Sequence, residues 1–503
     1  TAPTTGASSG GETQTASESA ESGKITKTDI VVGQASDIVT LDPAGQQDTT
    51  SGVLMKHAYS TLLDVDNEGK VVPDLAESYE MKSDTEYVFK LREDACFWDG
   101  TPVTAQDVKF SLDRAKGMPK TKSNTSKIEE VTVNGDHEVT IKLTEPYAAF
   151  KTIVTQHNLS ILSEKAVTEA GDSYGDVDNL LGSGPFKVTE WVPNDHYTLV
   201  RNDNYWGEMP IATSITCRVI PEGSARTIAL EAGEIDVVWS VDPTDCANVE
   251  SNPDVKLLSQ PSTGIDYVGM NTQKEKFSDK RVRQAINYAL DKQTFVDTII
   301  EGRGLVANSY INAAIPGWTD EVEAYPYDPE KAKELLAEAG YPDGFECSIF
   351  VNGDLRTRSA QILQAQLADV GIKVDISTYE WGALLDTLNA GEHEMFLLGW
   401  SNTSFDPDGS TYQLFYSGNH GATGNRAFFS NDKVDELILS AQRESEESKR
   451  MELYKELQFV LHDESPWCPL YYKENNVGVR ADLKGFTLHA GAQHYLGNCH
   501  YEE

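Results

Sequence analysis

The second half of the chain alternates helix-forming segments with short apolar strands, and this alternation limits the fold more than any other feature. One helix is expected over residues 328–340, with a proline in its first turn and a glycine at its end. Another is expected over residues 359–370, and it stops at Gly371 directly before the strand-like segment IKVDIST. Helices and strands that alternate in this way indicate an α/β lobe with parallel strands.

The first half of the chain has a different periodicity. Apolar and polar residues alternate with period two over residues 87–91 and 139–143, which is typical of half-buried antiparallel strands. Between these strands a helix is expected to begin at Thr104, whose hydroxyl can cap the amides that follow. A further helix is expected over residues 278–300, with Ser278 as its N-cap. Residues from about 60 to 174 therefore indicate an α+β unit.

The charge balance excludes one class of partner. The 503 residues include 80 acidic and 42 basic side chains, a formal net charge of −38, so the average surface repels nucleic acid. This acidity favours neutral or cationic ligands over strongly anionic ones, unless the local field of a cleft opposes the global charge. The sequence contains no apolar run of the roughly 20 residues that a membrane span requires. We therefore expect a soluble chain that binds no nucleic acid.

The opening segment differs in composition from the rest of the chain. Residues 1–24 are rich in Thr, Ser, Ala, Gly and Glu and offer almost nothing to a core. We expect residues 1–27 to form a disordered tether. Such a tether before an exported domain is typical of a lipoprotein whose signal and lipid-bearing cysteine have been removed. The expected location is the extracellular face of the cell membrane, with a lipid anchor of the Gram-positive type, or the periplasm.

Neither a metal framework nor covalent chemistry is indicated. The six cysteines are scattered, show neither C-x-x-C nor zinc-finger spacing, and their spacing assigns no disulfide. His420, His489, His494 and His500 leave a metal or metal-chelate ligand open, although solvated histidines are the more common case. The sequence has no nucleophile elbow, Walker A loop or H-E-x-x-H motif. We expect a protein that is not an enzyme and holds no cofactor.

Long ordered blocks of the sequence resemble one known family. The first blocks are PDLAESYE at residues 73–80 and YVFKLREDACFWDGTPVTAQDVKFSLDR at residues 87–114. Later blocks include GSGPFKVTEW at residues 182–191, FSDKRVRQAINYALDK at residues 277–292, and LGW followed by DPD at residues 398–408. In this order they are similar to the cluster C, family 5, extracellular solute-binding proteins. These are the dipeptide, oligopeptide, nickel and glutathione binders of ABC importers, and the resemblance covers about residues 29–485.

The resemblance implies an α/β fold of the periplasmic-binding-protein type II. It has two lobes, an inserted α+β subdomain in the first lobe, and a hinge of two strands. The implied boundaries are 28–59, 181–266 and 471–503 for the core of lobe I, 60–180 for the inserted subdomain, and 267–470 for lobe II. One hinge crossing is expected at residues 267–271 and the other near residues 471–479.

The resemblance also implies a function without chemistry. A monomer would capture a short peptide between its lobes and deliver it to an ABC permease and ATPase complex, because ligand contacts shift the hinge toward the closed state. One alternative is a ligand such as glutathione or a nickel or metal chelate. The loop at residues 416–429 resembles the glutathione-type branch, with Asn425 and Arg426 before paired aromatics. A second alternative is a peptide-sensing receptor without transport.

Candidate ligand-binding residues follow from the motif around Gly399-Trp400. Dipeptide binders place an acidic residue after this motif to hold the peptide ammonium, and the directly aligned residue here is Thr403. Asp406 or Asp408 is therefore expected to take that role from a shifted loop, unless they form an Asp-Pro turn and a helix N-cap. Trp400 would offer a flat face to the ligand, or it would pack between the lobes.

Four further candidates lie elsewhere in the sequence. Related proteins place an arginine that grips a ligand carboxylate near Arg356 and Arg358, although both side chains would be solvated in a purely structural interpretation. Asn271 would hydrogen-bond the ligand or merely end a hinge strand. Gly184 would let the backbone approach the cleft.

Overall fold

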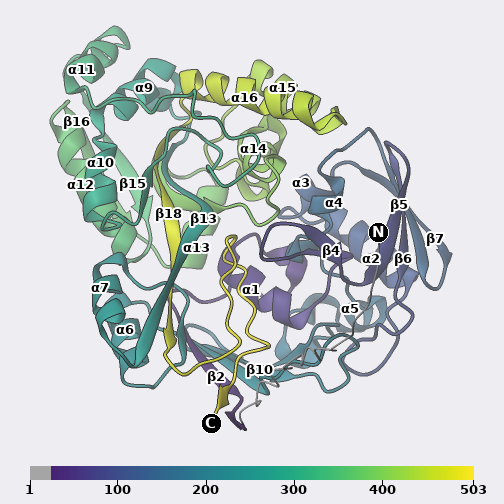
Figure 1. Cartoon of the computed structure of the whole chain (residues 1–503). Coiled ribbons are helices and arrows are strands. Elements are labelled where there is room, and N and C mark those ends of the chain that lie inside the picture. The colour runs from purple at the N-terminus through teal and green to yellow at the C-terminus, as the bar shows by residue number, and fades with distance from the viewer. Residues whose placement is uncertain (1–23) are drawn as a thin grey trace, which may run out of the picture.

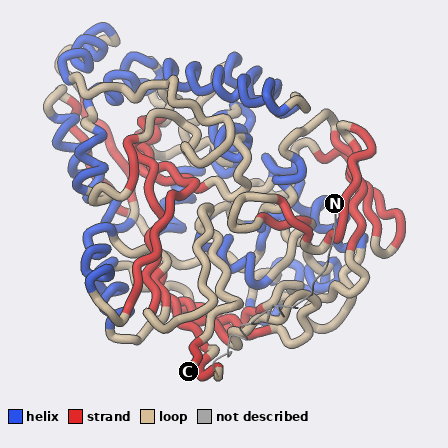
Figure 2. The backbone as a smooth tube through the Cα atoms, in the orientation of Figure 1, coloured by secondary structure: helices blue, strands red, loops and turns tan. Residues whose placement is uncertain are grey.

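The computed structural model describes residues 24–503, which form two lobes and a smaller antiparallel unit around one large sheet (Figure 1). In spatial order the strands of the large sheet are β16 (Ile372–Thr378), β15 (Phe345–Val351), β17 (Met395–Ser401), β13 (Val255–Met270), β18 (Trp467–Arg480), β12 (Val237–Val238), β2 (Asp29–Gln34), β11 (Ser214–Val219), β10 (His196–Arg201) and β9 (Phe186–Val192). The short strand β14 (Gly304–Val306) also pairs with β18. Figure 2 shows the strands of this sheet in red, with helices along its flanks.

The strands β13 and β18 connect the two lobes. They are 16 and 14 residues long and pair in an antiparallel register from end to end. Residues 255–261 of β13 pair with residues 474–480 of β18, and from Gly264 onward β13 also pairs with β17 of the second lobe. The pairing is irregular between Pro261 and Ile265. The expected hinge segments fall on these strands: residues 267–270 end β13 and residues 471–479 lie within β18. The two crossings expected there remain predictions.

The first lobe has strands of mixed direction covered by helices. β2 runs parallel to β11 and β12, whereas β10 runs antiparallel to β9 and β11. Its helices are α1 (Thr49–Ala58), α6 (Gly223–Glu231) and α7 (Pro243–Ser251). Leu54, Met55 and Ala58 of α1 pack against Ile30 and Val32 of β2 in one apolar core.

The expected tether ends earlier than its composition suggests. Residues 1–23 of the tether lie outside the described residues. Strand β1 (Ile25–Lys27) falls within the expected tether, and it pairs antiparallel with β19 (Tyr501–Glu502). This pairing joins segments from opposite ends of the sequence, so local composition could not indicate it.

The antiparallel unit agrees with the expected α+β pattern. Its four strands lie in the order β5 (Ala76–Ser83), β6 (Glu86–Leu91), β8 (Glu138–Leu143) and β7 (Ile128–Gly135). The period-two segments are β6 and β8, which pair directly. Thr104 caps α2 (Ala105–Lys116) in a capping box with Asp107. The unit also contains β3 (Leu63–Val65), β4 (Val71–Pro73), α3 (Lys122–Thr125), α4 (Phe150–Ile153) and α5 (Glu164–Ala170).

The second lobe confirms the α/β expectation. β15 lies between β16 and β17 and pairs parallel with both. The helices of this lobe are α8 (Glu275–Ser278), α9 (Lys280–Ala289), α10 (Lys292–Thr298), α11 (Pro329–Glu338), α12 (Gly353–Ala368), α13 (Trp381–Asn389), α14 (Asp408–Phe415), α15 (Asp432–Arg443) and α16 (Glu447–Glu464). No helix within residues 24–503 is both long and apolar enough to cross a membrane. The boundaries given above for the lobes remain predictions.

Two helices depart from the sequence prediction. The segment 278–300 is divided into α9 and α10, and the N-cap of α9 is Asp279 rather than Ser278, because the Asp279 carboxylate accepts a hydrogen bond from the backbone of Arg281. Helix α12 begins at Gly353, before the expected start at residue 359. Its first turns carry the polar sequence GDLRTR, which hides the apolar period that marks the rest of the helix.

Gly184 is required by a close approach of two backbones. A Cβ atom at this position would lie 2.5 Å from the carbonyl carbon of Ala58 and 2.6 Å from the backbone oxygen of His57, both at the end of α1. These are backbone atoms and cannot rotate away. The close approach predicted for Gly184 is therefore present, but it joins β9 to α1.

We expect Gly184→Ala to lower the free energy of unfolding by about 1–3 kcal/mol, because the added methyl group overpacks a rigid contact. Gly117→Ala is the matched control, since its Cβ would meet only the Arg114 carbonyl oxygen at 3.4 Å. Urea unfolding of both variants measures the difference. Equal stability of the two variants would contradict this account of Gly184.

Candidate functional site

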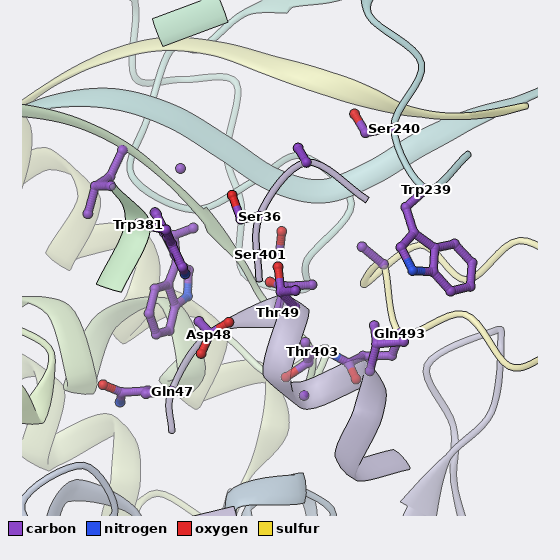
Figure 3. Close-up of a pocket in the computed structure, with 18 of the residues that line it drawn as sticks. Ser36, Gln47, Asp48, Thr49, Trp239, Ser240, Trp381, Ser401, Thr403 and Gln493 are labelled. Atoms are coloured by element: carbon purple, nitrogen blue, oxygen red, sulfur yellow. The ribbon is translucent and has the colours of Figure 1, made fainter. Parts of the chain in front are cut away.

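A cavity of about 370 Å³ lies between the two lobes. Its volume falls within the roughly 300–1,000 Å³ that is usual for small-molecule sites. Side chains from both lobes and from the connecting strand β18 line it, and Figure 3 shows ten of them by name. The first lobe contributes residues 34–36, 46–50, 52–53, 156–158, 239–240 and 492–494. Strand β18 contributes residues 473–476. The second lobe contributes Arg356, Trp381, Leu385, residues 398–401, Thr403, Gln413 and Arg426.

The first wall is built where β2 ends and α1 begins. The chain leaves β2 at Gln34, passes Ser36, and returns to the cavity at Gln47 and Asp48. Asp48 is the N-cap of α1, and its Oδ1 atom accepts a hydrogen bond from the backbone of Ser51 at 2.9 Å. The Oδ2 atom is buried without a hydrogen-bond partner. Burial raises the pKa of Asp48 above its usual value.

The second wall is built from α12, α13 and the end of β17. The Arg356 guanidinium lies 5.7 Å from the centre of the Trp381 ring, a separation at which a cation is attracted to an aromatic face. Its Nη1 atom donates to the Asn352 side chain at 2.6 Å. Trp381 is the first residue of α13, which follows strand β16. The arginine is thus held in place by its own lobe, and its Nε atom has no partner.

Two tryptophans face the cavity from opposite lobes. Trp239, which follows β12, and Trp381 appear on opposite sides of the close-up in Figure 3. Both indole Nε1 atoms are buried and have no hydrogen-bond partner. A buried indole N–H normally finds an acceptor. The Trp239 ring therefore offers an unused donor to whatever fills the space, whereas the Trp381 indole lies close enough to the Asp48 carboxylate to lower its pKa.

Unpartnered polar atoms gather around this cavity. Buried side-chain atoms without a hydrogen-bond partner among the described residues include Gln34 Nε2, Gln47 Oε1, Asp48 Oδ2, His157 Nδ1, Trp239 Nε1, Arg356 Nε, Trp381 Nε1 and Gln493 Oε1, all on lining residues. Such atoms are costly when they are left unpaired in a protein interior. The lining is therefore built to meet a polar occupant or water.

The sequence matches the family model described as bacterial extracellular solute-binding proteins, family 5 Middle, over residues 70–422. The chain belongs to this family.

Two curated relatives and one solved structure are similar along most of their length. The glutathione-binding protein GsiB of Escherichia coli O157:H7 is 32% identical over 479 residues, 92% of each chain. The dipeptide-binding protein of Escherichia coli (strain K12) is 30% identical over 470 residues, 86% of each chain. The periplasmic binding protein DppA from Helicobacter pylori, in complex with the peptide STSA, has a TM-score of 0.90 at 28% identity, covering 95% of this chain and 99% of that one. The predicted periplasmic-binding-protein fold of type II is confirmed.

Three residues predicted for the site of this family 5 protein line the cavity: Trp400, Thr403 and Arg356. The indole of Trp400 donates to the backbone oxygen of Gly409 at 3.0 Å, which fixes the ring at the end of β17. The Thr403 hydroxyl donates to Gln156 Oε1 at 2.9 Å, a contact from the second lobe to the first. Their contact with a ligand remains a prediction.

Asp406 and Asp408 are not among the lining residues. Asp406 forms a buried ion pair with Arg450, with 2.9 Å between Oδ2 and Nη1. Asp408 is 1% exposed and accepts hydrogen bonds from the Tyr147 hydroxyl at 2.5 Å and from Gln442 Nε2 at 2.9 Å. Asp408 is also the first residue of α14 rather than its N-cap. Both carboxylates are thus occupied by protein donors, and Asp408 links the second lobe to the antiparallel unit.

The other three candidates also lie outside the cavity lining. The Arg358 guanidinium binds the Asp242 carboxylate of the first lobe at 2.9 Å, so it joins the two lobes. Asn271 donates from its side chain to the backbone oxygens of Gly391 and His393 at 3.2 Å each. Gly184 lies against the end of α1, as described above. These contacts are structural, and a ligand role for the three residues has no support from the geometry.

The sequence analysis did not select Asp48, Trp239, Trp381 or Gln493. A signal existed for two of them. Asp48 precedes the helical segment that follows the first strand, and Trp381 begins the helix after IKVDIST. In α/β sheets the loops after the carboxyl ends of strands form the ligand crevice. Trp239 and Gln493 carry no comparable local signal.

We expect Asp408→Asn to change how stability depends on pH. Burial and the neighbouring Asp406 raise the pKa of Asp408 to about 6, against the hydrogen bonds from Tyr147 and Gln442. Between pH 4 and pH 6 the folded protein therefore keeps a proton on Asp408 that the unfolded chain has released. As pH rises from 4 to 6, the free energy of unfolding of the wild type should fall relative to that of Asp408→Asn by up to about 3 kcal/mol.

Thermal unfolding of both proteins across this pH range measures the difference. Asp254→Asn, at an exposed position, serves as the control and should follow the wild type at every pH. A constant difference between wild type and Asp408→Asn would show that Asp408 has an ordinary pKa.

Proposed function

We propose that this protein captures a short peptide between its lobes outside the cell and delivers it to an ABC permease and ATPase complex. The observation that carries the proposal is the cavity itself, which both lobes line with buried donors and acceptors that have no partner. Peptide-binding proteins of the same family, such as the DppA structure with STSA, share its fold. The protein would act as a monomer, lipid-anchored or periplasmic.

The physical mechanism needs only ligand contacts that are made in the closed state and are absent in the open state. Trp239 belongs to the first lobe and Trp381 to the second, so a ligand that touches both gains those contacts only when the lobes are closed. Binding energy then shifts the hinge equilibrium toward the closed state. A peptide main chain supplies both an acceptor for the Trp239 indole N–H and donors for the side-chain oxygens of Gln47 and Gln493. The permease would recognise the closed shape.

Glutathione is the second candidate ligand. Arg426, from the loop that resembles the glutathione-type branch, lines the cavity, and GsiB is a relative at 32% identity. For a metal chelate the support is weaker, because residues 24–503 contain no group of three or more His, Cys, Asp or Glu side chains suited to a metal ion. A sensing role without transport has no feature of its own in the structure.

Titration calorimetry of the purified protein against dipeptides, tripeptides, glutathione and nickel tests the proposal. We expect heat of binding with at least one peptide-like ligand and a smaller radius of gyration by X-ray scattering when it is bound. Nickel alone serves as the negative control. The absence of binding by all peptides and by glutathione, or identical scattering with and without a bound ligand, would refute capture between the lobes.

We expect Trp381→Ala to weaken binding of that ligand at least tenfold, about 1.4 kcal/mol, because buried aromatic anchors carry much of the energy of an interface. Calorimetry measures the change. Tyr327→Ala is the control, because Tyr327 is 47% exposed and lies outside the cavity. Unchanged affinity in folded Trp381→Ala would remove this side chain from the site.

A further inference from the structure

The charges inside the cavity differ from those of the whole chain. The protein carries a net charge of −38, yet the charged lining residues are three cations, Arg356, Arg426 and Lys473, and two anions, Asp48 and Glu474. Lys473 is already paired with Asp266 at 2.7 Å. Within residues 24–503 the two arginines form no ion pair. The cavity therefore keeps two guanidinium groups available.

Arg426 is the more deeply buried of the two arginines. It is 7% exposed, and its Nε atom donates to the Asn389 side chain at 3.0 Å. No described residue accepts a hydrogen bond from its Nη atoms. Burial lowers the pKa of Arg426, and the neighbouring Asp48 opposes this fall. A buried guanidinium without a counter-ion is costly, so an anion is expected beside it.

The two arginines lie on the second-lobe wall of the cavity. Both guanidinium groups are near enough to the Tyr267 hydroxyl to oppose the rise that burial causes in its pKa. Lys120 lies within electrostatic reach of Asp48, Asp386 and Arg426. The charged side chains among the second-lobe lining residues are the two arginines, so this wall of the cavity is positively charged. A peptide whose only carboxylate is the C-terminal one would pair with only one of the two guanidinium groups.

We propose that the cavity selects a short peptide with a second carboxylate in addition to its C-terminal one, and that Arg356 and Arg426 bind the two carboxylates. Each guanidinium can donate charge-assisted, bidentate hydrogen bonds to a carboxylate. The Asp48 carboxylate, which the Trp381 indole also approaches, lines the same cavity and would face the peptide ammonium. The inference rests on the proposed capture of a peptide and specifies its charge.

The second carboxylate has two chemical sources, a glutamate or aspartate side chain in an ordinary dipeptide, or the free α-carboxylate of a γ-linked glutamate as in glutathione. Calorimetry with the isosteric pair Ala-Glu and Ala-Gln, and with glutathione, separates them. We expect Ala-Glu or glutathione to bind at least tenfold more tightly than Ala-Gln. Whichever of the two acidic peptides binds more tightly identifies the source.

The matched variants are Arg426→Gln and Arg218→Gln. In Arg426→Gln the ratio of the affinity for the acidic peptide to that for Ala-Gln should fall to near one. The variant should still bind Ala-Gln, and this binding also shows that it is folded. Arg218 lies on β11 outside the cavity, and its variant should keep the full preference.

The outcomes distinguish selection by a second carboxylate from the proposed capture of a peptide, on which it rests. If Ala-Gln binds the wild type as tightly as both acidic peptides, capture of a peptide stands and selection by a second carboxylate is wrong. If none of the three peptides binds, both are wrong. A preference that survives in Arg426→Gln would overturn the role given to Arg426.

Discussion

The antiparallel pairing of β13 with β18 is the contact on which the rest of the structure depends. Because these strands belong to one sheet that crosses both lobes, their register sets where each wall of the cavity lies. Ser401 of the second wall is placed by its pairing with Gly264, and residues 473–476 of β18 line the space between the lobes. The pairing of β13 with β18 is irregular between Pro261 and Ile265, just where β13 begins to pair with β17 as well.

Buried charges in the second lobe fall into two groups with different purposes. Asp406 and Asp408 are fully partnered by Arg450, Tyr147 and Gln442, and these bonds hold the loop after β17 and its contact with the antiparallel unit. Arg356 and Arg426 instead donate hydrogen bonds to the neutral side chains of Asn352 and Asn389, so their positive charges are not neutralised by these contacts. These two acids therefore serve the architecture of the second lobe, whereas these two guanidinium groups face the cavity.

Much of the fold could be predicted from the sequence, and less of the site. Period-two segments, the Thr104 capping box and the parallel β15–β16 pair follow from local pattern and were found. The pairing of β1 with β19 and the partners of Asp406 and Asp408 depend on residues far away in the sequence, so no local rule gives them. Trp400, Thr403 and Arg356, which were selected by motif position, line the cavity, and their contact with a ligand remains a prediction. Motif position could not show that the nearby acids were already bound by other side chains.

The placement of Trp239 and Trp381 on opposite walls has a spectroscopic consequence. Indole emission shifts to longer wavelengths in water, and both rings now border a space that closes when the lobes meet. Lobe separation would wet both rings together, although they belong to different halves of the molecule. The unlabelled protein therefore contains its own optical reporters of hinge position, Trp239 on one wall of the cavity and Trp381 with Trp400 on the other.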